Sequence, residues 1–282
     1  MQHALRTIQN LEEHRVETSP KRACIALIIR VAGYSRPDLD TWISGLDPAA
    51  ELELLFIKRT VDPRDRWSGH IAVPGGRQDP GETDIETAVR EAKEEVGIDL
   101  EKDGFYVGAL DQRPLKVSWG RRLALILCPF VFVLNNPDAP MSPQWSEVAT
   151  CFWYPISRLF DEKYSVHEHV AVNDRVKLSF LPPFLAKFVR WQIGDMLFSA
   201  IEMHPDKIEP APQDVPAPPP PPYRVWGVTL GVLVDLFEVM KPGVFPKSAF
   251  LPTMKAWDMR FVVYLLSLKT CNKLDPGLGD LI

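Results

Sequence analysis

Residues 76–98 read GRQDPGETDIETAVREAKEEVGI, and this stretch decides how the chain is expected to fold. Thr83 is followed three residues later by Glu86, a capping box that predicts a helix beginning near Asp84. Gly97 is the usual residue just past a last helical turn, so the helix should end before it. The stretch therefore predicts a single helix with a defined start and a defined stop.

The predicted helix has two chemically different faces. At about 100° per residue its apolar side chains fall within roughly 100° of one another, which predicts a core-facing stripe. The members of this stripe are Ile85, Ala88, Val89, Ala92 and Val96. Glu91, Glu94 and Glu95 share the opposite face, because offsets of three and four point to one side. Like charges this close raise one another's pKa values unless a cation neutralises them.

Neighbouring residues indicate which cation would suit this acidic face. Arg90 precedes Glu94 by four residues, so its planar guanidinium can hold that carboxylate in a fixed pose. Oxygen ligands without a nearby His or Cys favour Mg²⁺ or Mn²⁺ over zinc. Upstream, residues 73–76 read VPGG, a turn that can bring a backbone carbonyl, here that of Gly76, close to a bound ion. The plain alternative is a solvated acidic helix face; the whole spacing favours a divalent metal carrying a phosphate ester.

The spacing resembles the Nudix box: a glycine, five residues, Glu, seven residues, then Arg-Glu-hydrophobic-any-Glu-Glu-any-Gly-hydrophobic. The matching positions are Gly76, Glu82, Arg90, Glu91, Glu94, Glu95, Gly97 and Ile98. Ala92 stands where a larger aliphatic residue is usual. The resemblance implies an α/β fold of the Nudix type, an α/β/α sandwich with a mixed β-sheet. It also implies metal-dependent attack of water on a nucleoside diphosphate linked to another moiety.

The resemblance also assigns roles within the box. Glu91, Glu94 and Glu95 would be metal ligands, Arg90 would orient Glu94, and Glu82 would be an outer or additional ligand. Metal ions neutralise a diphosphate and lower the pKa of a bound water, which a carboxylate can then deprotonate. Glu94 and Glu95 are the candidate bases inside the box, and a loop glutamate or histidine outside it stays open.

A second, less regular resemblance concerns the substrate. Residues 55–60 (LFIKRT) and 73–77 (VPGGR) resemble the signature of the coenzyme A diphosphatase branch, and residues 225–229 (VWGVT) resemble its Ile-Trp-Gly-Leu-Thr segment. The resemblance implies cleavage of coenzyme A or an acyl-coenzyme A to 3′,5′-ADP and 4′-phosphopantetheine. The residues that would bind this substrate are Arg59, Arg64, Gly75 and Arg77. The signature is irregular, with one extra residue between Arg64 and Gly69 and with Val73 in place of Phe.

Other functions stay open. The upstream segment could simply shape the sheet, and the substrate could be ADP-ribose, a dinucleoside polyphosphate or an oxidised dNTP. A non-catalytic Nudix-fold protein that binds a nucleotide or a partner is a further alternative. Such proteins usually lose a box carboxylate, and this chain keeps all four.

Composition limits the partners and the compartment. The chain has 282 residues, enough for one large domain or two small ones, and a net charge of −5. That charge gives no general attraction to nucleic acid or to a membrane. The Nudix resemblance implies a small nucleoside diphosphate derivative as partner. Four scattered cysteines predict free thiols in a reducing compartment. We expect the cytoplasm, with mitochondria and peroxisomes left open, and the sequence does not indicate an oligomeric state.

We expect a Nudix domain over residues 1–204, a Pro-rich linker or surface insertion over 205–222, and a helical C-terminal segment over 223–282 that docks on the domain. Prolines crowd the insertion, and five of them, 218–222, are consecutive, which favours polyproline II. Residues 219–224 (PPPPYR) could bind an SH3-type partner or act as a plain linker. Strands are expected at 23–31, 51–59, 105–113, 122–134, 147–154, 165–172 and 175–181, and helices at 155–160, 223–240 and 256–269.

Overall fold

The computed structural model describes residues 2–11, 21–62, 68–117, 122–171, 182–184, 187, 195–209, 212 and 220–243. The chain divides into two compact units, residues 1–166 with 200–249 and residues 167–199 with 250–282. Of the expected elements, the strand at 175–181, the helix at 256–269 and most of the Pro-rich insertion lie outside the described residues. No helix within the described ranges is long and apolar enough to cross a membrane.

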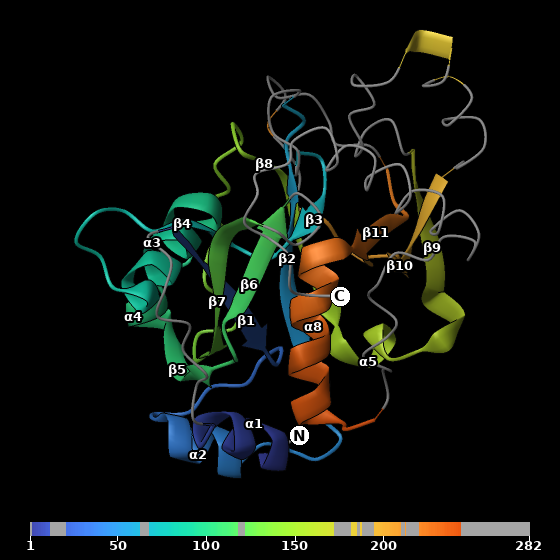
Figure 1. The fold of residues 1–282 in the computed structure, drawn as a ribbon. Coiled ribbons are helices and arrows are strands. Elements are labelled where there is room, and N and C mark those ends of the chain that lie inside the picture. Colours follow the sequence, from blue (N-terminus) through green and yellow to red (C-terminus); the bar gives the residue numbers. More distant parts are fainter. Residues whose placement is uncertain are drawn as a thin grey trace, which may run out of the picture. The chain divides into compact units, whose positions relative to one another are not determined.

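A mixed β-sheet forms the centre of the first unit (Figure 1). Its main path runs β3 (Ile71–Ala72), β2 (Glu53–Arg59), β1 (Arg22–Arg30), β7 (Arg122–Leu134) and β5 (Gly104–Ala109). Off this path, β4 (Gly75–Arg77) pairs with β1, β6 (Arg113–Val117) with β7, and β8 (Val148–Pro155) with β2. β1 runs parallel to β7 and antiparallel to β2 and β4. The mixed sheet expected from the sequence is thereby confirmed.

The box helix α3 (Asp84–Val96) begins and ends where its local signals predict. Thr83 accepts from the Glu86 amide, and the Glu86 side chain accepts from the Thr83 amide. Gly97 ends the helix with φ +77, and a Cβ at that position would lie 2.7 Å from the Ser142 amide nitrogen. The capping box and the glycine stop are therefore both confirmed.

Successive side chains of β2 point to opposite faces of the sheet and belong to two separate core layers. Leu55 and Ile57 belong to the buried cluster that includes Ala88 and Ala92 of α3. The next side chain, Phe56, faces the other way and stacks on Phe152, with ring centroids 5.9 Å apart. On that second side the chain also places β11 (Tyr223–Trp226), whose Tyr223 ring lies 5.5 Å from Phe152. The sheet is therefore covered by α3 on one face and contacts β11 on the other.

The remaining helices are short apart from α8 (Gly227–Met240). In the part of the chain that the structure describes they include α1 (Gln2–Gln9), α2 (Leu39–Ser44), α4 (Leu100–Asp103), α5 (Ile156–Leu159) and the 3₁₀ helix η1 (Glu162–Tyr164). The short helix expected at 155–160 is confirmed, whereas the sequence interpretation did not include α2 or α4. Ile8 of α1 is fully buried, and a Cβ on Gly108 of β5 would lie 3.1 Å from the Ile8 carbonyl carbon.

A second sheet has the order β11-β10-β9, with β9 over Ser165–Ala171 and β10 over Asp195–Met203. The expected helix over 223–240 is therefore wrong in its first turn. Tyr223 pairs with Met203 and Trp226 with Ala200, so residues 223–226 form an antiparallel strand. Strand β10 was not predicted, and the expected strand at 105–113 instead ends at Ala109, with β6 starting at Arg113.

Candidate functional site

The Arg90 guanidinium gathers three carboxylates at the solvent side of α3. Its Nε donates to Glu82 Oε1 at 2.7 Å, and its Nη1 donates to Glu91 Oε1 at 2.9 Å and to Glu94 Oε2 at 2.8 Å. Its Nη2 also donates to the carbonyl oxygen of Arg77 at 3.1 Å. The hydrogen bond from Arg90 lowers the pKa of Glu82 to about 2. One arginine therefore fixes the helix carboxylates relative to the loop before them.

Glu95 is the buried member of the acidic group, with 2% of its side chain exposed. Its Oε2 accepts from the Gly75 amide at 2.8 Å, and its Oε1 lies 3.8 Å from Nη1 of Arg59. Burial raises the pKa of Glu95 to about 8, and the nearby Glu91 carboxylate adds to this. A cation bound beside Glu95 would favour its ionised form.

The two glycines of β4 let the strand lie between β1 and α3. A Cβ on Gly76 would lie 2.5 Å from Cδ of Glu91, and a Cβ on Gly75 would lie 2.7 Å from Cα of Ile25. A Cβ at position 76 would force the Glu91 carboxylate to move, so glycine at 76 lets that carboxylate stay in its present place. The backbone of β4 therefore lies close to several carboxylates. Together they offer hard oxygen donors, and the carboxylates outnumber the nearby arginines. This set fits Mg²⁺ or Mn²⁺.

The structure brings most of the candidate substrate residues to the same place. Arg59 ends β2 beside Glu95, the Gly75 amide contacts Glu95, and the Arg77 carbonyl contacts Arg90. Arg64 lies outside the described residues. The roles of these residues toward metal and substrate remain proposals.

Glu147 is a site residue that the sequence interpretation did not name. It lies just before β8, and its carbonyl accepts from the Thr60 amide at 2.8 Å. Burial is the main cause of the raised pKa values of Glu91 and Glu95, and the charge of Glu147 raises both further. The pairing of β8 with β2 thus brings a glutamate from outside the box near enough for its charge to act on the acidic group.

The segment after the Pro-rich insertion reaches the arginine end of β2. The His70 carbonyl accepts from the Arg59 amide at 3.0 Å, which continues the β2–β3 register. The backbone of His70 therefore lies directly beside that of Arg59. The Trp226 ring lies 4.8 Å from the His70 ring, and Thr229 Oγ1 donates to the Ile71 carbonyl at 3.2 Å.

Comparisons with known proteins agree with this geometry. A NUDIX domain model matches residues 46–174. The chain is 33% identical over 248 residues to the uncharacterized protein C14C4.10c of Schizosaccharomyces pombe, covering 86% of this chain and 74% of that protein. It is 31% identical over 133 residues to the peroxisomal coenzyme A diphosphatase ndx-8 of Caenorhabditis elegans, covering 43% of this chain and 53% of that protein.

A further relative is the mitochondrial coenzyme A diphosphatase NUDT8 of Mus musculus, which is 22% identical over 202 residues, covering 71% of this chain and 77% of that protein. The match to ndx-8 spans only about half of that protein, 53%. The box positions, the mixed sheet and these matches lead to one assignment. The chain belongs to the Nudix family of hydrolases.

Proposed function

We propose that the chain is a metal-dependent diphosphatase that cleaves coenzyme A or an acyl-coenzyme A to 3′,5′-ADP and 4′-phosphopantetheine. The observation that carries the hydrolase part is the convergence of Glu82, Glu91 and Glu94 on Arg90, with Glu95 buried alongside. Three carboxyl groups on the Arg90 guanidinium, with the fourth 3.8 Å from that of Arg59, outnumber these arginines, which suits a divalent cation and, through it, a diphosphate.

Glu91, Glu94 and Glu95 would hold Mg²⁺ or Mn²⁺, with Glu82 and the Gly76 carbonyl as further candidates. When bound, the ion supplies charge neutralisation and a more acidic water. Arg90 keeps the carboxylates in position between turnovers, since its hydrogen bonds do not depend on substrate.

The base is proposed among three glutamates. Glu95 is 2% exposed and already hydrogen-bonded to Gly75, which suits holding an ion better than meeting bulk water. The Glu94 side chain is 53% exposed and anchored at one oxygen by Arg90, so its other oxygen can accept a proton from water. Glu147 is the candidate base outside the box.

Support for coenzyme A as the substrate comes from the arginines and aromatic rings near the end of β2. Arg59 and Arg77, with Arg64, would bind the diphosphate and the 3′-phosphate. The rings of His70 and Trp226, 4.8 Å apart, would contact the adenine. The names of ndx-8 and NUDT8 describe those two relatives as coenzyme A diphosphatases. The same names place them in peroxisomes and mitochondria, whereas composition favours the cytoplasm for this chain.

The domain organisation stays a proposal: a Nudix domain over 1–204, a linker or insertion over 205–222, and a docked segment over 223–282. Helix α8 and β11 belong to the same compact unit as the central sheet, which supports docking of residues 223–243. An SH3-type partner for residues 219–224 is a further proposal that rests on the proline run alone.

Mass-spectrometric product analysis tests the proposed function. The panel contains coenzyme A, an acyl-coenzyme A, ADP-ribose, diadenosine polyphosphates and oxidised dGTP, each with Mg²⁺ or Mn²⁺. We expect 3′,5′-ADP and 4′-phosphopantetheine from wild type and from the control Glu101→Gln, an exposed glutamate of α4. Glu94→Gln should lose about 10²–10⁴-fold in rate.

The other outcomes separate the alternatives. Cleavage of a different panel member would keep the acidic-site chemistry and reject coenzyme A as the substrate. If neither metal supports cleavage of any member, the chain is better described as a Nudix-fold binding protein.

A further inference from the structure

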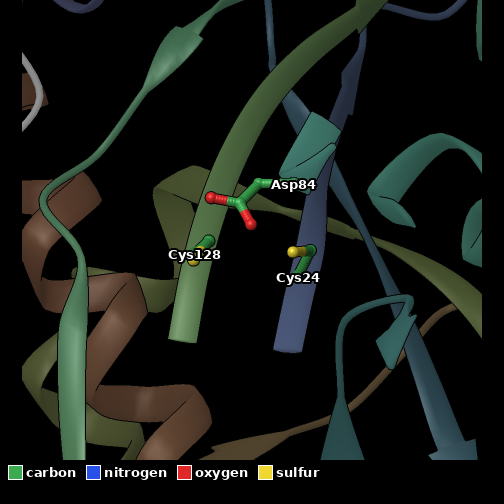
Figure 2. Close-up of side chains that lie close together, drawn as sticks. All are labelled: Cys24, Asp84 and Cys128. Atoms are coloured by element: carbon green, nitrogen blue, oxygen red, sulfur yellow. The ribbon is translucent and has the colours of Figure 1, made fainter. Parts of the chain in front are cut away.

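Three ligand-bearing side chains converge beneath the start of α3 (Figure 2). Cys24 comes from β1, Cys128 from β7 and Asp84 from the first position of α3. One ligand atom of each lies within 4.8 Å of the others. Both thiols are fully buried, and the Asp84 side chain is 22% exposed. Cys24 and Cys128 are far apart in the sequence, and it is the β1–β7 pairing that brings them together. The sequence interpretation therefore described the cysteines only as scattered.

The two cysteines are register partners in the parallel β1–β7 pair, so both side chains leave the sheet on the face that α3 covers. Parallel neighbours are about 4.8 Å apart, wider than the roughly 3.8 Å between Cβ atoms in a disulfide. Two sulfurs on a tetrahedral ion with bonds of about 2.3 Å lie about 3.8 Å apart without any bond between them. A bridging ion therefore spans this pair with less distortion than a disulfide does.

A cationic group already lies within the cluster. Arg22 donates from Nε to Asp84 Oδ1 at 2.7 Å and from Nη2 to Asp84 Oδ2 at 2.6 Å. The same Nη2 lies 3.2 Å from Cys128 Sγ. The fold thus stabilises a positive charge between a carboxylate and a thiol, at a position that no part of the proposed hydrolysis uses.

An ion can take the place of the guanidinium as the partner of Asp84 without changing the total charge of the cluster. With neutral thiols, Arg22 and Asp84 cancel each other. When a divalent ion binds, the two thiol protons pass to solvent, and two thiolates plus one carboxylate balance the ion and Arg22. The total charge is zero in both states, so the exchange leaves no uncompensated charge in the core.

We propose that Cys24, Cys128 and Asp84 form a second metal site, for a thiophilic divalent ion such as Zn²⁺, which takes Asp84 from Arg22. Two sulfurs and one oxygen select zinc-like ions over Mg²⁺, in contrast to the oxygen ligands of the acidic site. Three protein ligands leave one tetrahedral position for water. The 22% exposure of Asp84 gives the ion an approach from the start of α3.

Occupancy of this site acts on the box helix. Gln78 Nε2 donates to Asp84 Oδ1 at 3.1 Å and to the Glu82 carbonyl at 2.8 Å, so a change of partner at Asp84 is passed to Glu82. If the proposed function holds, the ion lowers diphosphatase activity even in excess Mg²⁺. Binding itself does not depend on that function.

Cobalt titration of the full chain tests the site, because thiolate ligands give Co²⁺ an intense charge-transfer absorption that carboxylates do not. We expect this band at one equivalent of Co²⁺ in excess Mg²⁺. It should be lost in Cys24→Ser and in Cys128→Ser. The matched control is Cys151→Ser, a buried cysteine whose sulfur lies 3.9 Å from Met141 Sδ, and it should keep the band.

Arg22→Met supplies a second measurement that does not depend on the stability of the cysteine variants. Removal of the competing guanidinium should tighten Co²⁺ binding about tenfold or more, equivalent to about 1.4 kcal/mol. Cys271→Ser is added to every variant so that this fourth thiol cannot contribute. The proposal is overturned if neither the parent chain nor Arg22→Met shows the band, or if Cys151→Ser removes it as fully as Cys24→Ser does. The cluster would then be a buried ion pair with two inert thiols.

Discussion

The backbone amide of Gly75 donates a 2.8 Å hydrogen bond to the carboxyl group of Glu95, which joins the glycine turn to the buried end of the box helix. This contact holds Glu95 in a place where water cannot solvate its charge. Burial consequently raises the pKa of Glu95 to about 8 from an ordinary value of 4.5. The metal-free protein therefore carries a protonated glutamic acid at neutral pH.

The first prediction follows from that pKa. Between about pH 4.5 and about pH 8 the unfolded chain has lost the Glu95 proton while the folded chain keeps it, so the free energy of unfolding falls as pH rises. Glu95→Gln removes this dependence. Thermal unfolding with a chelator should show variant and wild type alike near pH 5 and the variant melting higher near pH 8. Parallel curves over the whole range would contradict the prediction.

Gly76→Ala should weaken metal binding while the protein still folds. The new Cβ would lie 2.5 Å from Cδ of Glu91, and the carboxylate must move to make room. We expect Mn²⁺ affinity to fall by about tenfold or more, measured by calorimetry, a change equivalent to about 1.4 kcal/mol. Gly33→Ala is the control, since a Cβ there meets nothing within 4 Å although φ is +67. It should lose some stability and bind Mn²⁺ normally.

Arg90→Lys should fold but lose about 100-fold in kcat/KM, because an ammonium group cannot reproduce the fork that contacts Glu82, Glu91 and Glu94. Arg30→Lys is a matched control: Arg30 is similarly exposed and pairs with Glu53 at the opposite end of β1 from the Cys24–Gly76 strand pair. Steady-state kinetics on the substrate found by product analysis measures both. Equal losses in the two variants would show that the fork geometry at Arg90 is unimportant.

Trp226→Ala should raise the KM for an adenine-containing substrate about tenfold while leaving kcat nearly unchanged, since stacking on a base is worth roughly 1–3 kcal/mol. The ring lies 4.8 Å from that of His70, whose carbonyl accepts from the Arg59 amide. Trp153→Ala, which removes a ring under Arg30, is the control and should leave KM unchanged. An unaltered KM in Trp226→Ala would place the adenine elsewhere.

Short sequence patterns predicted the elements whose ends depend on neighbouring residues alone. The capping box and glycine stop fixed α3, and the apolar run at 122–134 coincides with β7. The strand at 223–226 was mistaken for helix because its apolar residues continue into α8, and only its pairing with β10 distinguishes them.

The same limit applies to the site. The box residues occur together in sequence and were found there. Glu147, His70 and the Cys24–Cys128 pair depend on strand register between distant segments, which no local pattern reports.

The parallel alignment of β1 with β7 has a consequence for assembly. Arg22 and Cys128 meet although they are 106 residues apart, and the whole box lies in the chain between them. Closing such a long loop is entropically unfavourable before the contacts form, and non-local pairing of this kind slows folding. A nascent or truncated chain that contains every box residue but ends before residue 122 would lack β7, the parallel partner of β1. The motif is contiguous in the sequence, yet the sheet that carries it is complete only when β1 has paired with a strand from beyond the box.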